Sequence, residues 1–341
     1  MSTTANDVQA EFALQESRIR AAFMRFVRAI VGVAVVAKIE ALLLERRYND
    51  IPGMLLKGPG ELSDLAETIR DALSAAGKQA ANSIKPPRGI GAHVTFDMRN
   101  VSVEQWVKQY SADLVRNITE DQRAAIRLAI SRGIESGRGP KAIVYDLIGR
   151  LDASGNRVGG IVGLTEQQTE SALNARNELL KLDSNYFTRL ARDTRFDNIV
   201  RDAIENKKSL SAADVDRITS RYADKLLQVR GDTIAQTEAL QAMNNGRDFA
   251  YAQAISEGKV SAQNVTKKWD SAHDKKVRST HRALSGTKIN FQSAFVSPSG
   301  ARMRFPGDTS LGAGPEEIIR CRCVAQYTID FLAEKLGNGG A

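Results

Sequence analysis

Apolar residues recur at helical spacing through most of the chain. Between residues 8 and 47 the pattern predicts one long helix, and it predicts a second helix over 61–81. From 91 to 260 we expect further helices, over 166–182, 186–207, 212–227 and 230–257. Ser102, Thr119 and Thr165 each stand three residues before a glutamine, the spacing of a helix-capping box. Most of the chain is therefore predicted to be helical.

The pattern changes near Ser261. Short strands are predicted over 265–269, 291–296, 302–305 and 321–328, with a helix over 275–284 and a turn at 297–300. We therefore expect a mainly α protein, in which a multi-helix body precedes a small α+β C-terminal domain with a short antiparallel sheet. The expected divisions are an N-terminal helical region (1–90), a helical middle domain (91–260), and the α+β domain with its Gly-rich tail (261–341).

Charge adds one asymmetry. The chain of 341 residues has a formal net charge of +8, and residues 261–341 carry 12 Lys/Arg against 7 Asp/Glu. This excess suits contact with a polyanion such as DNA, and it is equally compatible with a solvated, solubilising face. The N-terminus lacks the features of a secretory signal, and the most apolar run, 29–37, is too short to span a bilayer.

The two cysteines, Cys321 and Cys323, are too few for a disulfide framework, so a reducing compartment is expected. Several common chemistries are excluded, because the chain has no phosphate loop of the G-x-x-x-x-G-K-[ST] type, no G-x-G-x-x-G fingerprint, no H-E-x-x-H zinc helix and no G-x-S-x-G nucleophile elbow.

The C-terminal segment carries an ordered set of distinctive residues. In chain order they are Trp269, Asp270, Arg278, His281, Gly286, Pro306, Pro315, Glu317, Cys321, Arg322 and Cys323. This order resembles the signature of the phage Mu F-like head-morphogenesis family, whose members close with a Cys-Arg-Cys strand. Most members have Asn where this chain has Arg320. An upstream stretch, 230–245 with Glu238, resembles the helix that precedes the domain, although Gln236 replaces the usual Arg.

The resemblance covers about 157–328 and implies a phage minor head protein. Such a protein is expected in the virion, in the capsid interior near the portal, and in the host cytoplasm during assembly. Its expected partners are the portal protein, capsid or scaffold proteins, and DNA; no membrane insertion and no enzymatic activity are expected. The signature residues would be structural: Glu238, Trp269, Asp270, His281, Gly286, Cys321 and Cys323.

Basic residues of the terminal domain are the candidate contacts with DNA or the portal. They are Lys267, Lys268, Arg278, Arg320 and Arg322. If the last strand alternates, Arg320 and Arg322 face away from the cysteines, toward a partner or simply toward solvent.

The chemistry of the thiols and the histidine stays open. On a strand, Cys321 and Cys323 would lie on one face about 6.6 Å apart. With His281 they could bind zinc, His273 or Asp270 completing a tetrahedron. Otherwise the thiols are small buried hydrophobes and no cofactor is needed. In an enzymatic alternative, a metal-dependent nuclease- or toxin-like module, Asp270, Arg278, His281 and Glu317 would converge on one cleft. The resemblance itself requires the His281 ring to meet both thiols.

Overall fold

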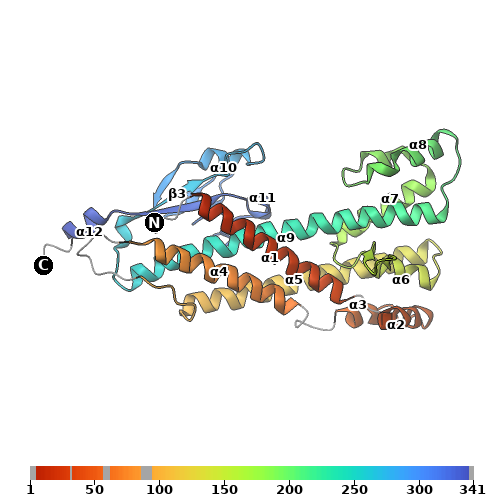
Figure 1. Ribbon diagram of the computed structural model, residues 1–341, viewed down its shortest axis with the longest axis horizontal. Helices are drawn as coiled ribbons and strands as arrows, with labels where there is room; N and C mark the ends of the chain where they lie inside the picture. Colours follow the sequence, from red (N-terminus) through yellow and green to blue (C-terminus); the bar gives the residue numbers. More distant parts are fainter. Residues whose placement is uncertain (1–4, 31–32, 57–61, 86–93, 338–341) are drawn as a thin grey trace. The chain divides into compact units, whose positions relative to one another are not determined.

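The computed structural model describes residues 5–30, 33–56, 62–85 and 94–337, and it is mainly helical as expected (Figure 1). The described helices are α1 (Ala5–Ala29), α2 (Val33–Leu44), α3 (Asp50–Leu55), α4 (Ser63–Ser83), α5 (Val101–Glu135), α6 (Pro140–Ile148), α7 (Glu166–Lys181), α8 (Asp197–Glu205), α9 (Ala212–Ser256), α10 (Ser279–Leu284), α11 (Pro315–Ile318) and α12 (Phe331–Gly337). The strands are β1 (Arg150–Leu151), β2 (Arg157–Val158), β3 (Val265–Asp270), β4 (Lys288–Asn290), β5 (Phe295–Val296), β6 (Arg302–Met303) and β7 (Val324–Ile329).

The chain divides into two compact units that are not consecutive in sequence. One unit combines residues of 1–22, 65–110 and 232–341; the other combines residues of 23–64 and 111–231. This partition differs from the three consecutive domains expected from the sequence. The reason is that α1, α5 and α9 each contribute residues to both units, so changes of composition along the chain do not mark the boundaries.

The first unit contains the small sheets of the C-terminal segment. A three-stranded antiparallel sheet has the order β4-β3-β7, and β5 pairs with β6 as a hairpin across 297–300. The hydrophobic core of this unit is not formed by the C-terminal α+β segment alone. Phe12 of α1, Ala76 of α4 and Met243 of α9 are buried in the same cluster as Trp269 and Phe295. The N-terminal helix, far away in sequence, is thus part of the surroundings of the C-terminal sheet.

The second unit is built from α2, α3, α6, α7, α8 and the β1–β2 hairpin, together with the C-terminal parts of α1 and α5 and the N-terminal part of α9. Helix α2 packs against α6. The buried Gln122 of α5 joins the Gly-rich segment to this unit, because its amide donates to the Leu164 carbonyl at 2.5 Å and its oxygen accepts from Gly163 N at 2.7 Å.

Two of the three predicted helix caps are wrong. At Thr165 the reciprocal capping box forms, with Gln168 as its partner. Thr119 instead lies inside α5 and donates to the Val115 carbonyl at 2.7 Å, the bond that a helix interior offers a hydroxyl. Helix α5 begins ahead of Ser102, whose N–H donates to the Asn100 side chain at 3.0 Å, so Asn100 takes the capping role.

The predicted break between 227 and 230 is also absent, since α9 is one helix of 45 residues. The segment holds no proline, and a lone glycine costs a helix only about 1 kcal/mol. No helix in the described part of the chain has the length and apolarity needed to cross a membrane.

Candidate functional site

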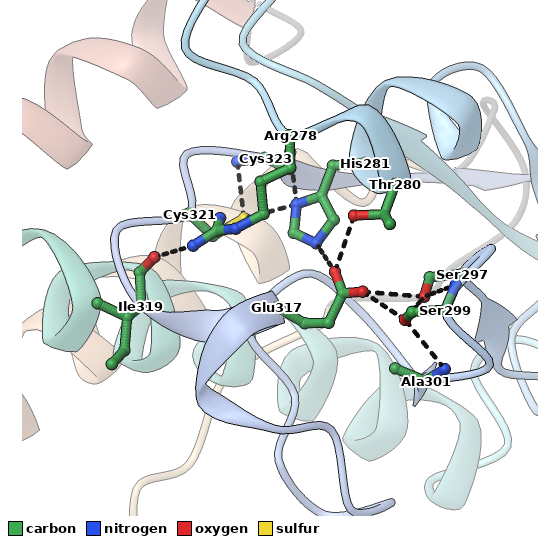
Figure 2. A network of polar contacts seen from close by, with 10 residues as sticks. All are labelled: Arg278, Thr280, His281, Ser297, Ser299, Ala301, Glu317, Ile319, Cys321 and Cys323. Atoms are coloured by element: carbon green, nitrogen blue, oxygen red, sulfur yellow. Dashed lines mark hydrogen bonds and ion pairs between the residues drawn. The ribbon is translucent and has the colours of Figure 1, made fainter.

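Four short elements of the first unit bring the signature residues together. Trp269 ends the buried face of β3, His281 lies on α10, and Glu317 lies on α11. Cys321 and Cys323 lie in the segment just before β7. Figure 2 shows the imidazole of His281 between the two cysteines on one side and the Glu317 carboxylate on the other.

The His281 ring contacts both thiols through one nitrogen. Its Nδ1 lies 3.3 Å from Cys321 Sγ and 3.5 Å from Cys323 Sγ. All three side chains are buried, with at most 2% of each residue exposed. The contact with the Cys321 thiol, supported by His281, lowers the pKa of Cys323 to about 5, while the same contact and burial raise the pKa of Cys321. The resemblance led us to expect that the His281 ring contacts both thiols, and the structure shows this contact.

The cysteines do not lie on a strand, which corrects the sequence-based prediction. Pairing of β7 with β3 ends at Val324 opposite Asp270. Next to this end of the ladder, the Asn244 side chain of α9 hydrogen-bonds the backbone on both sides of Val324. It donates to the Cys323 carbonyl at 3.3 Å and accepts from Ala325 N at 3.5 Å. The sulfurs consequently lie within 4.8 Å of each other, closer than strand geometry would place them.

The opposite nitrogen of the ring meets a carboxylate. His281 Nε2 lies 2.7 Å from Glu317 Oε2, and Glu317 is itself 2% exposed. Thr280 Oγ1 donates to Oε2 at 3.1 Å, and Ser297 and Ser299 donate to Oε1 at 3.1 and 2.5 Å. Burial by itself would raise the pKa of Glu317, but the Ser299 bond and the charge of His281 outweigh it and lower the pKa. The network therefore holds a buried, ionised carboxylate against the ring.

The sequence did not single out the hydroxyls of this network. Ser297 and Ser299 belong to the β5–β6 turn and Thr280 precedes His281, and serine in a turn is common enough to carry no functional signal. Only the burial of the Glu317 carboxylate, which the structure shows, requires hydrogen-bond donors at this place.

Other signature residues have structural positions. The Trp269 ring meets His281 and Phe295 edge-on, with centroids 5.0 and 5.2 Å away. Gly286 has φ +87° and donates its N–H to the Trp269 carbonyl at 2.8 Å, which explains a glycine at this turn. Asp270 accepts from Gln326 at 2.6 Å and contacts His273 at 2.9 Å. Asp270 and His273 therefore pair with each other and lie outside the His281–cysteine group, contrary to their expected role as fourth ligand.

The candidate contact residues differ widely in exposure. Lys267 was expected to face a partner, but it is 1% exposed and its ammonium lies 5.2 Å from the centroid of the Phe291 ring, so it is not a surface residue. Lys268 is half-buried. Arg278 donates to the Ile319 carbonyl, and Arg322 forms a two-point ion pair with Asp274 at 2.5 and 2.7 Å. Only Arg320 among the five is fully on the surface.

Arg320 has a left-handed backbone, with φ +57°. An arginine there costs about 1–2 kcal/mol, whereas asparagine tolerates this conformation. The position is thus suited to the Asn expected from the resemblance. Its guanidinium reaches Gln236 Oε1 at 3.4 Å, so the two residues that depart from the expected pattern contact each other.

We expect Arg320→Asn to raise the free energy of unfolding by about 0.5–1 kcal/mol, because it relieves the left-handed strain and gives up only an exposed contact. Urea unfolding measures the change. Arg320→Ala removes the same side chain without relieving the strain and should not stabilise; equal stabilisation by both variants would contradict the explanation.

Glu238, the signature residue of α9, is buried beside the hydroxyl of Tyr110, which donates to its carboxylate. Burial raises the pKa of Glu238 to about 7, since only this one bond favours the charged form. A carboxyl whose pKa is raised by folding binds its proton more tightly in the folded state. Below pH 4.5 the burial of this carboxyl therefore causes no loss of stability through ionisation. The free energy of unfolding then falls as the pH rises from 4.5 through about 7.

Glu238→Gln should remove this dependence. Relative to the variant, the original chain is expected to lose about 3 kcal/mol of unfolding free energy between pH 4.5 and 8. Urea titrations of both proteins across this range measure the difference. A difference that stays constant with pH would show that the carboxyl is not held in its neutral form.

The match to a known family extends over most of both units. The family model described as "Phage Mu protein F like protein" matches residues 124–326, which include α9, β3, α10 and both cysteines. No curated protein and no solved structure matches the chain. Because the matched range is more than half of the 341 residues, the chain belongs to the Phage Mu F-like family, and it is a phage head morphogenesis protein.

Proposed function

We propose that this protein is a minor head protein that enters the phage capsid in association with the portal and contacts DNA during head assembly or genome delivery. The observation that carries the proposal is the family match over residues 124–326, which includes the helices from α6 to α9 as well as the terminal signature. Capsid or scaffold proteins are the further expected partners. The protein works by binding in this proposal.

The burial of the polar cluster supports binding over turnover. A general base must come within hydrogen-bond reach of the substrate proton. His281 and Glu317 are 1% and 2% exposed, and they contact each other. Three hydroxyl groups donate hydrogen bonds to the Glu317 carboxylate, so its oxygens already have partners within the protein. The rival function is a metal-dependent nuclease- or toxin-like enzyme. DNA cleavage that needs a metal and disappears in His281→Ala would contradict the proposal.

Exposed lysines of the 275–282 segment favour a DNA contact at this part of the first unit. Lys275, Lys276 and Arg282 are exposed, and none of them forms an ion pair among the described residues. The more buried basic residues, Lys267 and Arg322, are occupied within the unit. We therefore propose that Lys275 and Lys276 contact DNA.

A matched pair of variants tests this contact. Lys275→Glu with Lys276→Glu should weaken binding to duplex DNA and reduce the slope of log affinity against log salt by about 2, because each phosphate contact contributes about 0.9. Lys207→Glu with Lys208→Glu changes the charge equally at two other adjacent exposed lysines and should leave the slope unchanged. Equal effects of the two pairs, or a salt-independent affinity, would contradict a contact at 275–276.

Portal association is tested separately. The tagged chain, expressed with the portal protein of the phage that encodes it, should co-purify with the portal from cell extracts, and a tagged unrelated basic protein should not. If the portal stays in the flow-through while the chain itself is folded and abundant, the portal part of the proposal is wrong.

A further inference from the structure

Three potential metal-binding side chains in the first unit direct their ligand atoms at one another. The Nδ1 of His281 and the sulfurs of Cys321 and Cys323 all lie within 4.8 Å of each other, in a buried group (Figure 2). Around a tetrahedral zinc ion with usual bond lengths, a sulfur and a nitrogen ligand are about 3.6 Å apart. The two distances here, 3.3 and 3.5 Å, are close to that separation.

The two sulfurs converge on the same nitrogen of the ring. Nε2 faces the Glu317 carboxylate at 2.7 Å, so Nδ1 is the ring nitrogen that faces the sulfurs. Both sulfurs approach this one nitrogen at similar distances, 3.3 and 3.5 Å. A cation between the three atoms would accept a lone pair from each. The Cys323 N–H, 3.4 Å from Cys321 Sγ, is then a donor to a thiolate sulfur.

The surroundings of the ring have the form of a second coordination shell. A metal-bound histidine usually donates its other N–H to a carboxylate, which fixes the ring and its tautomer. Glu317 lies 2.7 Å from Nε2 in this position, and Thr280, Ser297 and Ser299 in turn fix Glu317. The Glu317 carboxylate is therefore held in place by three hydroxyl groups, of which Ser297 is buried, Thr280 is half-buried and Ser299 is exposed.

We propose that His281 Nδ1 and the Sγ atoms of Cys321 and Cys323 bind one Zn²⁺ ion, with Glu317 as the outer residue that orients His281. Both thiols release their protons to solvent on binding, so the two thiolates neutralise the ion's charge. Two thiolates and an imidazole suit zinc better than magnesium or calcium, which prefer oxygen ligands. The fourth position falls to a water molecule, since Asp270 and His273 lie outside the group.

The ion would act structurally. It joins α10, which carries His281, to the segment that leads into β7, and Trp269 packs against the same histidine. Binding to the folded state alone would stabilise the protein in proportion to the logarithm of the zinc concentration. The proposal is independent of the head function, because a zinc-binding protein and a zinc-free protein are both compatible with portal association.

The test uses the full chain, purified in a reducing buffer and equilibrated with Zn²⁺ or Co²⁺. We expect one zinc per chain by elemental analysis, and a thiolate-to-cobalt charge-transfer band in the cobalt form. The band is diagnostic because Cys321 and Cys323 are the chain's two cysteines. Cys323→Ser should weaken the band and lose stoichiometric zinc. His273→Ala, which changes the exposed histidine outside the group, should keep both.

Glu317→Gln separates orientation from ligation. The variant keeps all three ligands, so it should retain the cobalt band while its zinc affinity falls by about 10–100-fold. If the variants fail to fold, thermal unfolding of the original chain with and without a chelator still tests the site. A melting temperature that drops when the chelator is added supports it. A folded original chain that binds no stoichiometric zinc, shows no thiolate–cobalt band and melts identically with chelator overturns the proposal.

Discussion

Trp269→Ala is expected to lower the free energy of unfolding by about 3–5 kcal/mol, the largest single loss in the first unit. The indole is fully buried, and its ring meets the edges of His281 and Phe295. The substitution would leave a cavity in the cluster that Phe12 and Met243 also line, so residues of three distant segments lose contacts together. Urea unfolding followed by circular dichroism measures the loss.

Trp106 provides the control. It is the chain's other tryptophan, half-buried in the same unit, where it stacks on Tyr110 with centroids 4.4 Å apart. Trp106→Ala should cost about 1 kcal/mol, the value of an aromatic pair with partial burial. If the two variants lose equal stability, Trp269 is not the centre of a shared core.

Gly246→Ala should destabilise the protein by about 3 kcal/mol, although alanine is the better helix former by about 1 kcal/mol. A Cβ at this position of α9 would lie only 2.3 Å from the backbone oxygen of Leu73 in α4. A carbonyl within a helix cannot move away as a flexible side chain can, so the two helices must separate. Thermal unfolding and urea titration both report the change.

Gly53→Ala makes the same substitution where an added Cβ meets nothing within 4 Å. Because Gly53 lies within α3, this variant should be neutral or stabilised by up to about 1 kcal/mol. Stabilisation by both variants would mean that α4 and α9 do not approach as closely at Gly246 as described.

The sequence predicted the helical class and the main strand of the terminal sheet because both leave strong periodic signals. Strand β3 was expected over 265–269 and extends over 265–270. Helix boundaries were less predictable, since a Thr-x-x-Gln spacing marks a real cap at Thr165 and a helix interior at Thr119. Local sequence cannot distinguish them, because the difference lies in whether the preceding residues continue the helix.

The site was partly predictable in the same sense. The family signature placed His281 with the two cysteines, and the structure brings their ligand atoms together. It did not reveal that Lys267 would be buried. Lys267 shares the inner face of β3 with Val265 and Trp269, but a lysine is rarely buried on such a face. Nor could it show Asn244 of α9 bonding the Cys323 carbonyl, a contact between residues 79 positions apart.

Quantitative mass spectrometry of purified procapsids and DNA-filled heads tests the head role most directly. The particles would come from cells infected with the phage that encodes this chain. We predict the chain in both particles, in a fixed ratio to the portal protein and in far fewer copies than the major capsid protein. Its absence from both particles, while it is abundant in the same infected-cell lysate, would contradict the account.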